Sequence, residues 1–181
     1  AEYERPWAVR SPVRGRLSDL KDGKEQVIDA FVQERLSRAG FQLQEEATRE
    51  ELIRRVSIDL TGLPPSIEEV DAFVADQSQE AYRRVVDRLL GSPRYGERMA
   101  AWWLDGARYG DSHGYDNDLE NAQWPWRNWI IESFNANQPY DQFLVDQLAG
   151  DLLDHPTVAQ RIATGLHRMN IRNNESGINK E

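Results

Sequence analysis

Closely spaced helix start and stop signals are the feature of this sequence that most constrains its fold. Thr48 with Glu51, and Ser66 with Glu69, have the spacing of capping boxes, in which two side chains satisfy free N–H groups of a first helical turn. The run Thr-Gly-Leu-Pro-Pro at 61–65 is typical of a helix end. No segment alternates apolar and polar residues over five or more positions, as a half-buried strand does. The sequence therefore predicts an all-α fold.

Apolar spacing predicts a compact domain of about eight helices. The expected helices cover about 25–39, 48–60, 66–74, 78–90, 95–109, 125–135, 140–148 and 158–168. Ser78 is the expected cap of the fourth helix, and Trp103, Trp129 and Phe134 are expected in the core. Residues 1–24 have no period and are interpreted as an extended arm or a linker from an upstream module. Residues 25–169 form the helical domain, and 170–181 form a polar tail.

Composition argues against several classes of function. Acidic residues outnumber basic ones by 31 to 22, and the net charge of -9 repels nucleic acid. No stretch approaches the roughly 20 apolar residues of a membrane span. The chain has no cysteine, which excludes thiolate catalysis and covalent haem attachment within these residues. No catalytic triad order, phosphate-binding glycine loop or metalloprotease motif is present, so the sequence selects no reaction and leaves open whether the chain is an enzyme.

The densest polar segment is the loop at 110–123. Asp111, Asp116, Asp118 and Glu120 offer hard oxygen ligands of the kind that calcium prefers, and they form a candidate calcium site. His113 would instead suit a transition metal. The alternative is a surface loop held by Asx-turns and helix caps, without a metal.

Aromatic residues are concentrated in the same region. Trp124 and Tyr115 are candidates for stacking on a sugar or a porphyrin, with Arg108 and Arg127 as polar partners. The alternative is that the helical aromatic residues form the core. The spacing also allows two ion pairs, Asp105 with Arg108 and Arg127 with Asp141.

His167 is expected near the end of the last helix, where its charge would favour the helix C-terminus. It is also able to ligate a metal or a haem iron. Both roles stay open on the residues alone.

Several strings together resemble one family. They are IDAF at 28–31, DLTGLPP at 59–65, VDRLLGSP at 86–93, YGER at 95–98, WLD at 103–105, ARY at 107–109, PYD at 139–141, QLAGDLL at 147–153 and IATG at 162–165. In this order they resemble the planctomycete cytochrome-C-associated domain, a domain of unknown function, over nearly the whole chain. The residues that match the polar signature of the family are Asp105, Arg108, Tyr109, Asp111, Ser112, Gly114, Tyr115, Asp118, Arg127, Asp141, His167, Asn174 and Glu175.

The resemblance implies an architecture more than an activity. Such domains lie between a cytochrome-like module and a second downstream domain in large exported proteins. A Cys-x-x-Cys-His haem-attachment motif commonly follows the segment matched here by 173–177. The resemblance therefore implies an extracytoplasmic location, periplasmic or secreted, a c-type haem in the full-length protein, and neighbouring domains as partners. It makes His167 a candidate haem-proximal residue.

Two functional hypotheses follow. The first is a helical module of a haem-associated multidomain protein, with a role in redox chemistry or assembly. The alternative is a domain that binds or processes polysaccharide through the aromatic and acidic loop, with or without calcium.

Overall fold

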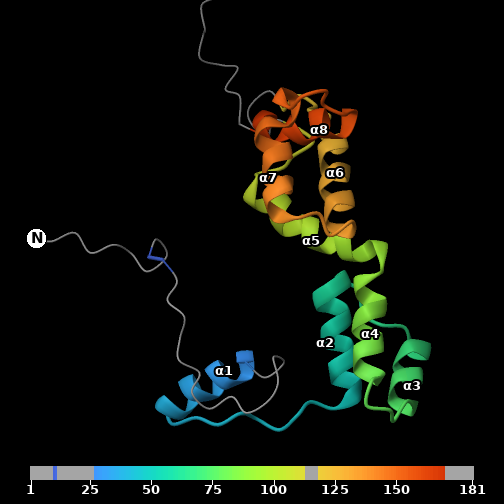
Figure 1. Ribbon diagram of the computed structural model, residues 1–181. Helices are drawn as coiled ribbons and strands as arrows, with labels where there is room; N and C mark the ends of the chain where they lie inside the picture. Colours follow the sequence, from blue (N-terminus) through green and yellow to red (C-terminus); the bar gives the residue numbers. More distant parts are fainter. Residues whose placement is uncertain (1–9, 12–26, 113–117, 170–181) are drawn as a thin grey trace, which may run out of the picture. The chain divides into compact units, whose positions relative to one another are not determined.

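The computed structural model describes residues 10–11, 27–112 and 118–169, and the regular structure in these ranges is helical (Figure 1). The α-helices are α1 (Val27–Arg38), α2 (Arg49–Thr61), α3 (Ile67–Ala75), α4 (Ala81–Leu90), α5 (Pro93–Gly106), α6 (Trp124–Asn135), α7 (Tyr140–Ala149) and α8 (Val158–Ala163). Two 3-10 helices are η3 (Gly150–Leu152) and η4 (Thr164–Arg168). The described residues contain no strand, only an isolated antiparallel bridge between Ser112 and Glu120. The predicted all-α fold is confirmed.

The chain divides into two compact units, Ala1–Glu46 and Ala47–Glu181. The division separates α1 from the other helices. The predicted boundary at residue 24 lies outside the described residues, and the one at residue 169 lies at their edge, so both stay predictions. Within the described ranges, no helix has the length and apolar character that crossing a bilayer requires.

The first unit contains α1 and the segment after it. Gly40 takes the left-handed conformation expected after a helix end, with a φ of 75°. The N–H of Phe41 then donates to the carbonyl of Leu36 over 2.9 Å. The apolar residues of α1 are not enclosed within this unit, since Ile28, Phe31 and Val32 are exposed.

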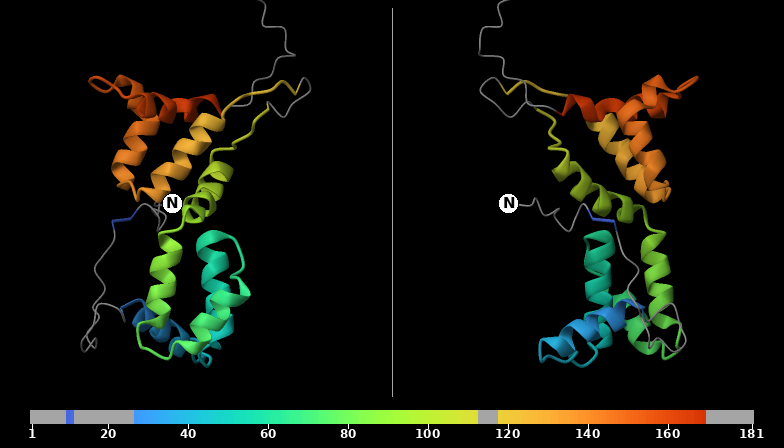
Figure 2. Two further views of the ribbon diagram at one scale, coloured as in Figure 1. Left: turned by 90° about the vertical axis from the view of Figure 1, so that its right-hand side faces the viewer. Right: turned by 60° about the vertical axis from the view of Figure 1, so that its left-hand side comes forward.

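In the second unit, α2, α3 and α4 pack around a small core (Figures 1 and 2). Ile53, Phe73 and Ala81 are its buried residues. Both predicted capping boxes are present: Thr48 with Glu51 opens α2, and Ser66 with Glu69 opens α3.

The prediction that Ser78 caps the fourth helix is wrong. Helix α4 begins at Ala81 after Glu80, and no side chain caps it. The backbone N–H of Ser78 donates to Asp76 Oδ1 over 3.1 Å, and its hydroxyl accepts from Arg84 Nη2 over 2.6 Å. Ser78 therefore belongs to the turn that ends α3, and its hydroxyl is engaged by an arginine of α4.

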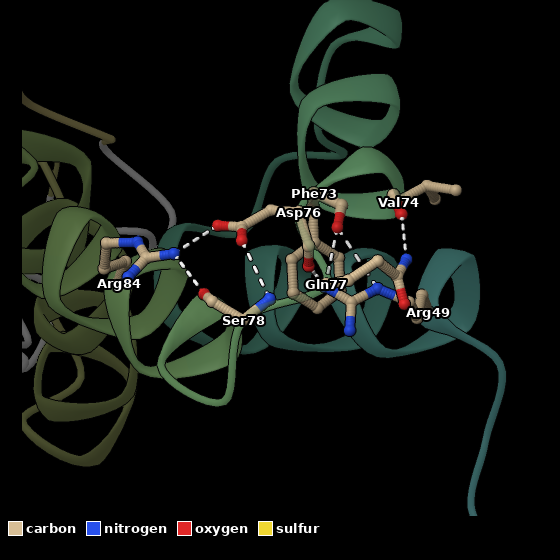
Figure 3. Close-up of polar contacts among 7 residues, drawn as sticks. All are labelled: Arg49, Phe73, Val74, Asp76, Gln77, Ser78 and Arg84. Carbon is tan, nitrogen blue, oxygen red and sulfur yellow. Dashed lines mark hydrogen bonds and ion pairs between the residues drawn. The ribbon is translucent and has the colours of Figure 1, made fainter.

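Side chains complete the hydrogen bonds at the end of α3 (Figure 3). Arg49 donates to the carbonyl of Phe73 from Nε over 3.1 Å and from Nη2 over 2.6 Å, and Nη2 also reaches the carbonyl of Asp76 over 2.6 Å. Gln77 Nε2 donates to the carbonyl of Val74 over 2.8 Å. The last carbonyls of a helix have no partner within it, so these bonds fix the start of α2 to the end of α3.

A larger aromatic core joins α5, α6, α7, α8 and η4. Phe143 lies at its centre: its ring stacks on Trp129 at 5.4 Å, meets Trp103 edge-on at 4.9 Å and lies 5.6 Å from Phe134. Trp129 is buried, and Trp103 and Phe134 are partly buried against it. The prediction that these three residues build the core is confirmed.

The predicted helix at 158–168 is wrong in its second half. After Ala163 the chain continues as the 3-10 helix η4, and the Thr164 hydroxyl donates to the carbonyl of Arg161 over 2.8 Å. Here the chain passes so close to α6 that a Cβ on Gly165 would lie 2.9 Å from Trp126 Cβ. We attribute the tighter turn to this contact. It comes from a distant part of the chain, so the local apolar pattern does not predict it.

One buried carboxylate is held entirely by glutamine amides. Asp146 Oδ2 accepts from Gln138 Nε2 over 2.8 Å, while Oδ1 accepts from Gln142 over 2.8 Å and from Gln160 over 3.2 Å. These glutamines come from the α6–α7 connection, from α7 and from α8. Asp146 thus connects three parts of the second unit.

Replacing Asp146 by leucine should destabilise the protein by about 3 kcal/mol, because three partly buried amide donors lose their charged acceptor. Asp141→Leu is the matched control: this carboxylate is exposed in the first turn of α7 and should cost at most about 1 kcal/mol. Urea unfolding of both variants measures the difference. Equal losses would contradict the structural role of Asp146.

A second test concerns the contact between α5 and α6. The N–H of Gly96 donates to Asn135 Oδ1 over 2.8 Å, and a Cβ on Gly96 would overlap the carbonyl oxygen of Ile131 and lie 2.6 Å from Asn135 Nδ2. Gly96→Ala should therefore destabilise the protein by about 3 kcal/mol. Gly106→Ala in the same helix meets nothing within 4 Å and should be neutral or stabilising by about 0.5 kcal/mol. Thermal unfolding distinguishes the two, and a tolerated Gly96→Ala would contradict this packing.

Candidate functional site

The connection from α5 to α6 begins at a strained turn. Arg108, one residue past the C-cap of α5, has a φ of 57°, which is uncommon for a residue other than glycine. The N–H of Tyr109 donates back to the carbonyl of Leu104 over 2.9 Å. This turn directs Tyr109 toward the N-terminal end of α6, where its ring stacks on Trp126 at 6.2 Å between centroids.

Tyr109, Asp111 and Arg127 form a polar cluster at the base of the loop. The Tyr109 hydroxyl donates to Asp111 Oδ1 over 2.5 Å, and Arg127 Nη1 lies 3.7 Å from Asp111 Oδ2. The Arg127 guanidinium is also 5.9 Å from the centre of the Tyr109 ring. The N–H of Asn121 donates to the backbone carbonyl of Asp111 over 2.7 Å, which closes the loop on itself.

The environment of Tyr109 keeps its phenol protonated. Desolvation, followed by the hydrogen bond to Asp111, raises the pKa of Tyr109 to about 12, although the positive charge of Arg127 opposes this shift. At neutral pH the phenol is a hydrogen-bond donor and not a general base. The cluster can hold the loop in place. Its two charged groups, Asp111 and Arg127, pair with each other.

The candidate calcium ligands differ in the contacts that they make in the structure. The carboxylate of Asp111 contacts Tyr109 and Arg127, whereas Glu120 is exposed and its backbone forms the β-bridge with Ser112. Asp118 makes an interaction of its own, and Asp116 and His113 lie outside the described residues. No group of three or more His, Cys, Asp or Glu side chains in the described ranges is arranged to hold a metal. The calcium site as a set stays a prediction.

Among the described residues, the candidate ligand-binding side chains do not form one site. Trp124 is the first residue of α6 and is 53% exposed, while Tyr115 lies outside the described residues. Arg108 is exposed, and in this part of the chain no ion pair joins it to Asp105. The predicted pair of Arg127 with Asp141 is wrong, because the turn at Arg108 brings Asp111 to Arg127 instead.

His167 lies in η4 and is exposed. Its Nε2 is 3.2 Å from the carbonyl oxygen of Leu148 in α7, and it donates there when that nitrogen is protonated. The imidazole thus connects η4 to α7 and leaves Nδ1 for another partner. Its predicted proximity to a haem remains an expectation.

A groove of about 230 Å³ lies between α3 and α4. Ala72, Phe73, Ala81 and Val85 line it, and the ion pairs Asp76–Arg84 and Glu69–Arg88 cross between its two helices. The bonds from Arg84 and Ser78 lower the pKa of Asp76 to about 2 (Figure 3). These charges have partners within the protein, so the groove is explained by helix packing.

Three described arginines are partly buried: Arg49, Arg98 and Arg127. Arg49 and Arg127 have oxygen acceptors, whereas Arg98 Nε is buried without one in the part of the chain that the structure describes. The Arg98 guanidinium lies 5.4 Å from the ring centre of Trp102, which is exposed. Sequence reasoning missed this pair, although its spacing of four residues on one helix could have indicated it.

Ultraviolet titration should show one tyrosine that ionises near pH 12, and this signal should disappear in Tyr109→Phe. Because the folded pKa lies above the ordinary value of 10.0, the contribution of Tyr109 to stability is complete below pH 10 and is lost as the pH rises to about 12. In Asp111→Asn the pKa should move down toward 10.0, since the negative acceptor is removed. A Tyr109 that ionises near pH 10 in the unmodified protein would contradict the cluster.

The family model PSCyt2, described as a protein of unknown function (DUF1549), matches residues 27–181. Neither curated proteins nor solved structures gave a match. The matched segment contains every helix described above and most of the chain. The protein therefore belongs to the PSCyt2 family, whose name suggests an association with cytochromes.

Proposed function

We propose that this protein is a helical docking module of an extracytoplasmic, c-type cytochrome-associated multidomain protein, and that its role is in assembly. The name of the family supports the association with cytochromes. The observation that carries the docking role is an apolar strip on the outer face of α7 and η3.

The apolar strip consists of Val145, Leu148 and Leu152. Leu148 is 58% exposed and Leu152 is 80% exposed, and Val145 is exposed beside them. A spacing of three residues places Val145 and Leu148 on one face of α7, opposite the buried Phe143 and Gln147, and Leu152 follows in η3 with its side chain exposed. An exposed apolar surface of this kind is typical of an interaction site.

His167 supports the location of this contact. Its bond to the carbonyl of Leu148 holds the imidazole beside the middle of the strip, and its exposure makes it accessible to a partner. A haem-bearing neighbour docked on the strip would meet His167 at its edge. There His167 would act as a polar contact near the haem, while haem attachment would rest on cysteines outside these 181 residues.

Hydroxyl-radical footprinting of the polypeptide as it occurs naturally tests the proposal. Leu148 and Leu152 should be labelled several-fold less in the natural polypeptide than in the 181-residue chain, because a docked neighbour excludes solvent from them. Leu63 and Leu90, which are exposed on other elements, serve as controls and should be labelled equally in both. Visible absorption of the natural polypeptide should show the Soret band of a haem.

Two further variants sharpen this test. Leu148→Glu should restore solvent access to Leu152 in the natural polypeptide, because a buried carboxylate opposes docking. Leu90→Glu introduces the same charge away from the strip and should leave the protection of Leu152 unchanged. Equal labelling of Leu152 in the natural polypeptide and the 181-residue chain, or the absence of a Soret band, would refute the proposed role.

A further inference from the structure

We propose that one face of α5, formed by Arg98, Trp102 and Asp105, binds an oligosaccharide that contains a uronic acid. This site is separate from the apolar strip on α7 and does not depend on the proposed docking role. Three observations support it: an arginine without an acceptor, an exposed indole beside it, and a carboxylate further along the same face.

Arg98 has hydrogen-bonding capacity that the protein does not use. Its Cδ would lie 3.3 Å from a Cβ on Gly62, so the aliphatic part of the side chain covers the C-terminal end of α2. Its Nε is buried, and the described residues give it no acceptor. The Nη groups are not among the buried atoms, and the described residues give them no acceptor either, so a ligand carboxylate can pair with the guanidinium from the solvent side.

Trp102 supplies an apolar surface next to this cation. The indole is 64% exposed and its ring centre is 5.4 Å from the guanidinium carbon of Arg98. The electron-rich face of an indole attracts the polarised C–H groups on the face of a sugar ring, as it attracts cations and the edges of other rings. The next residue of α5, Trp103, is instead partly buried against the core, and its indole N–H donates to Gln147 over 2.9 Å.

Asp105 completes the row. Positions 98, 102 and 105 fall on one stripe of an α-helix, and a rise of 1.5 Å per residue spreads them over about 10 Å. Asp105 is exposed, and its carboxylate accepts hydrogen bonds from hydroxyl groups. The row therefore offers a cation for a carboxylate, a ring for stacking and an acceptor for neutral hydroxyls, over about the length of two sugar rings.

The order of these charges selects among ligands. An acidic peptide or a densely charged polyanion would bring negative charge against Asp105 and against a protein of net charge -9. An oligosaccharide in which uronic acid alternates with a neutral sugar places one carboxylate at Arg98 and neutral hydroxyls at Asp105. This alternation is the chemistry that we assign to the ligand.

The experiment uses a tetrasaccharide of alternating glucuronate and N-acetylglucosamine, together with its carboxyl-reduced form. Binding to the 181-residue chain is measured by calorimetry and by the shift of the Trp102 indole N–H signal in NMR. The acidic tetrasaccharide should bind and move this signal. The reduced form should bind about tenfold or more weakly, because it lacks the charged acceptor for Arg98.

Two variants test the assigned contacts. Trp102→Ala should abolish measurable binding. Arg98→Lys keeps a positive charge over the end of α2 but loses the planar fork, so affinity should fall about tenfold while the protein stays folded. Tyr140→Ala and Arg161→Lys replace an exposed aromatic residue and an exposed arginine elsewhere, and both should bind like the unmodified protein.

Three outcomes would overturn the proposal. The first is no binding of the acidic tetrasaccharide, with unchanged circular dichroism of every variant. The second is equal binding of the acidic and reduced forms, which would remove the role of Arg98. The third is loss of binding in Trp124→Ala but not in Trp102→Ala, which would place the ligand at the start of α6 instead.

Discussion

The close contact of α5 with α6 is the constraint on which the rest of the second unit depends. Gly96 has no side chain, so the carbonyl of Ile131 and the amide of Asn135 approach the backbone of α5 directly. Asn135 also donates from Nδ2 to the carbonyl of Pro93 over 3.2 Å, so one side chain serves both a donor and an acceptor of the first turn of α5. With this spacing fixed, Trp103 of α5 reaches Phe143 and Gln147 of α7. The packing of the aromatic core thus depends on Gly96, where a larger residue would not fit.

Polar side chains play a comparable part wherever helix ends leave backbone groups unpaired. Arg49 and Gln77 supply the donors at the end of α3, and the glutamines around Asp146 connect the α6–α7 connection, α7 and α8. An unmet hydrogen bond inside a protein costs about 1–3 kcal/mol, as much as burying an aliphatic side chain contributes. The arrangement of α7 against α8 therefore depends on amide chemistry as well as on hydrophobic burial.

The sequence predicts well those features whose causes are local. Capping boxes require only residues three positions apart, and both boxes expected at Thr48 and Ser66 are present. The role of Ser78 was missed because Arg84, from the following helix, takes its hydroxyl. The end of the last helix was missed because the ring of Trp126 lies against Gly165. In each error the deciding contact comes from a residue that no local pattern identifies.

The same distinction applies to the candidate site. The acidic loop attracts attention in the sequence because its carboxylates are adjacent along the chain. In the structure Asp111 accepts from Tyr109 and lies 3.7 Å from Arg127, so both of its carboxylate oxygens already have partners. Arg98 shows the reverse: its spacing from Trp102 indicates that the two can pair, but only the structure shows that its guanidinium has no acceptor among the described residues. Binding requires groups whose partners are missing, so the arginine is a better guide to a ligand than the denser cluster of charges.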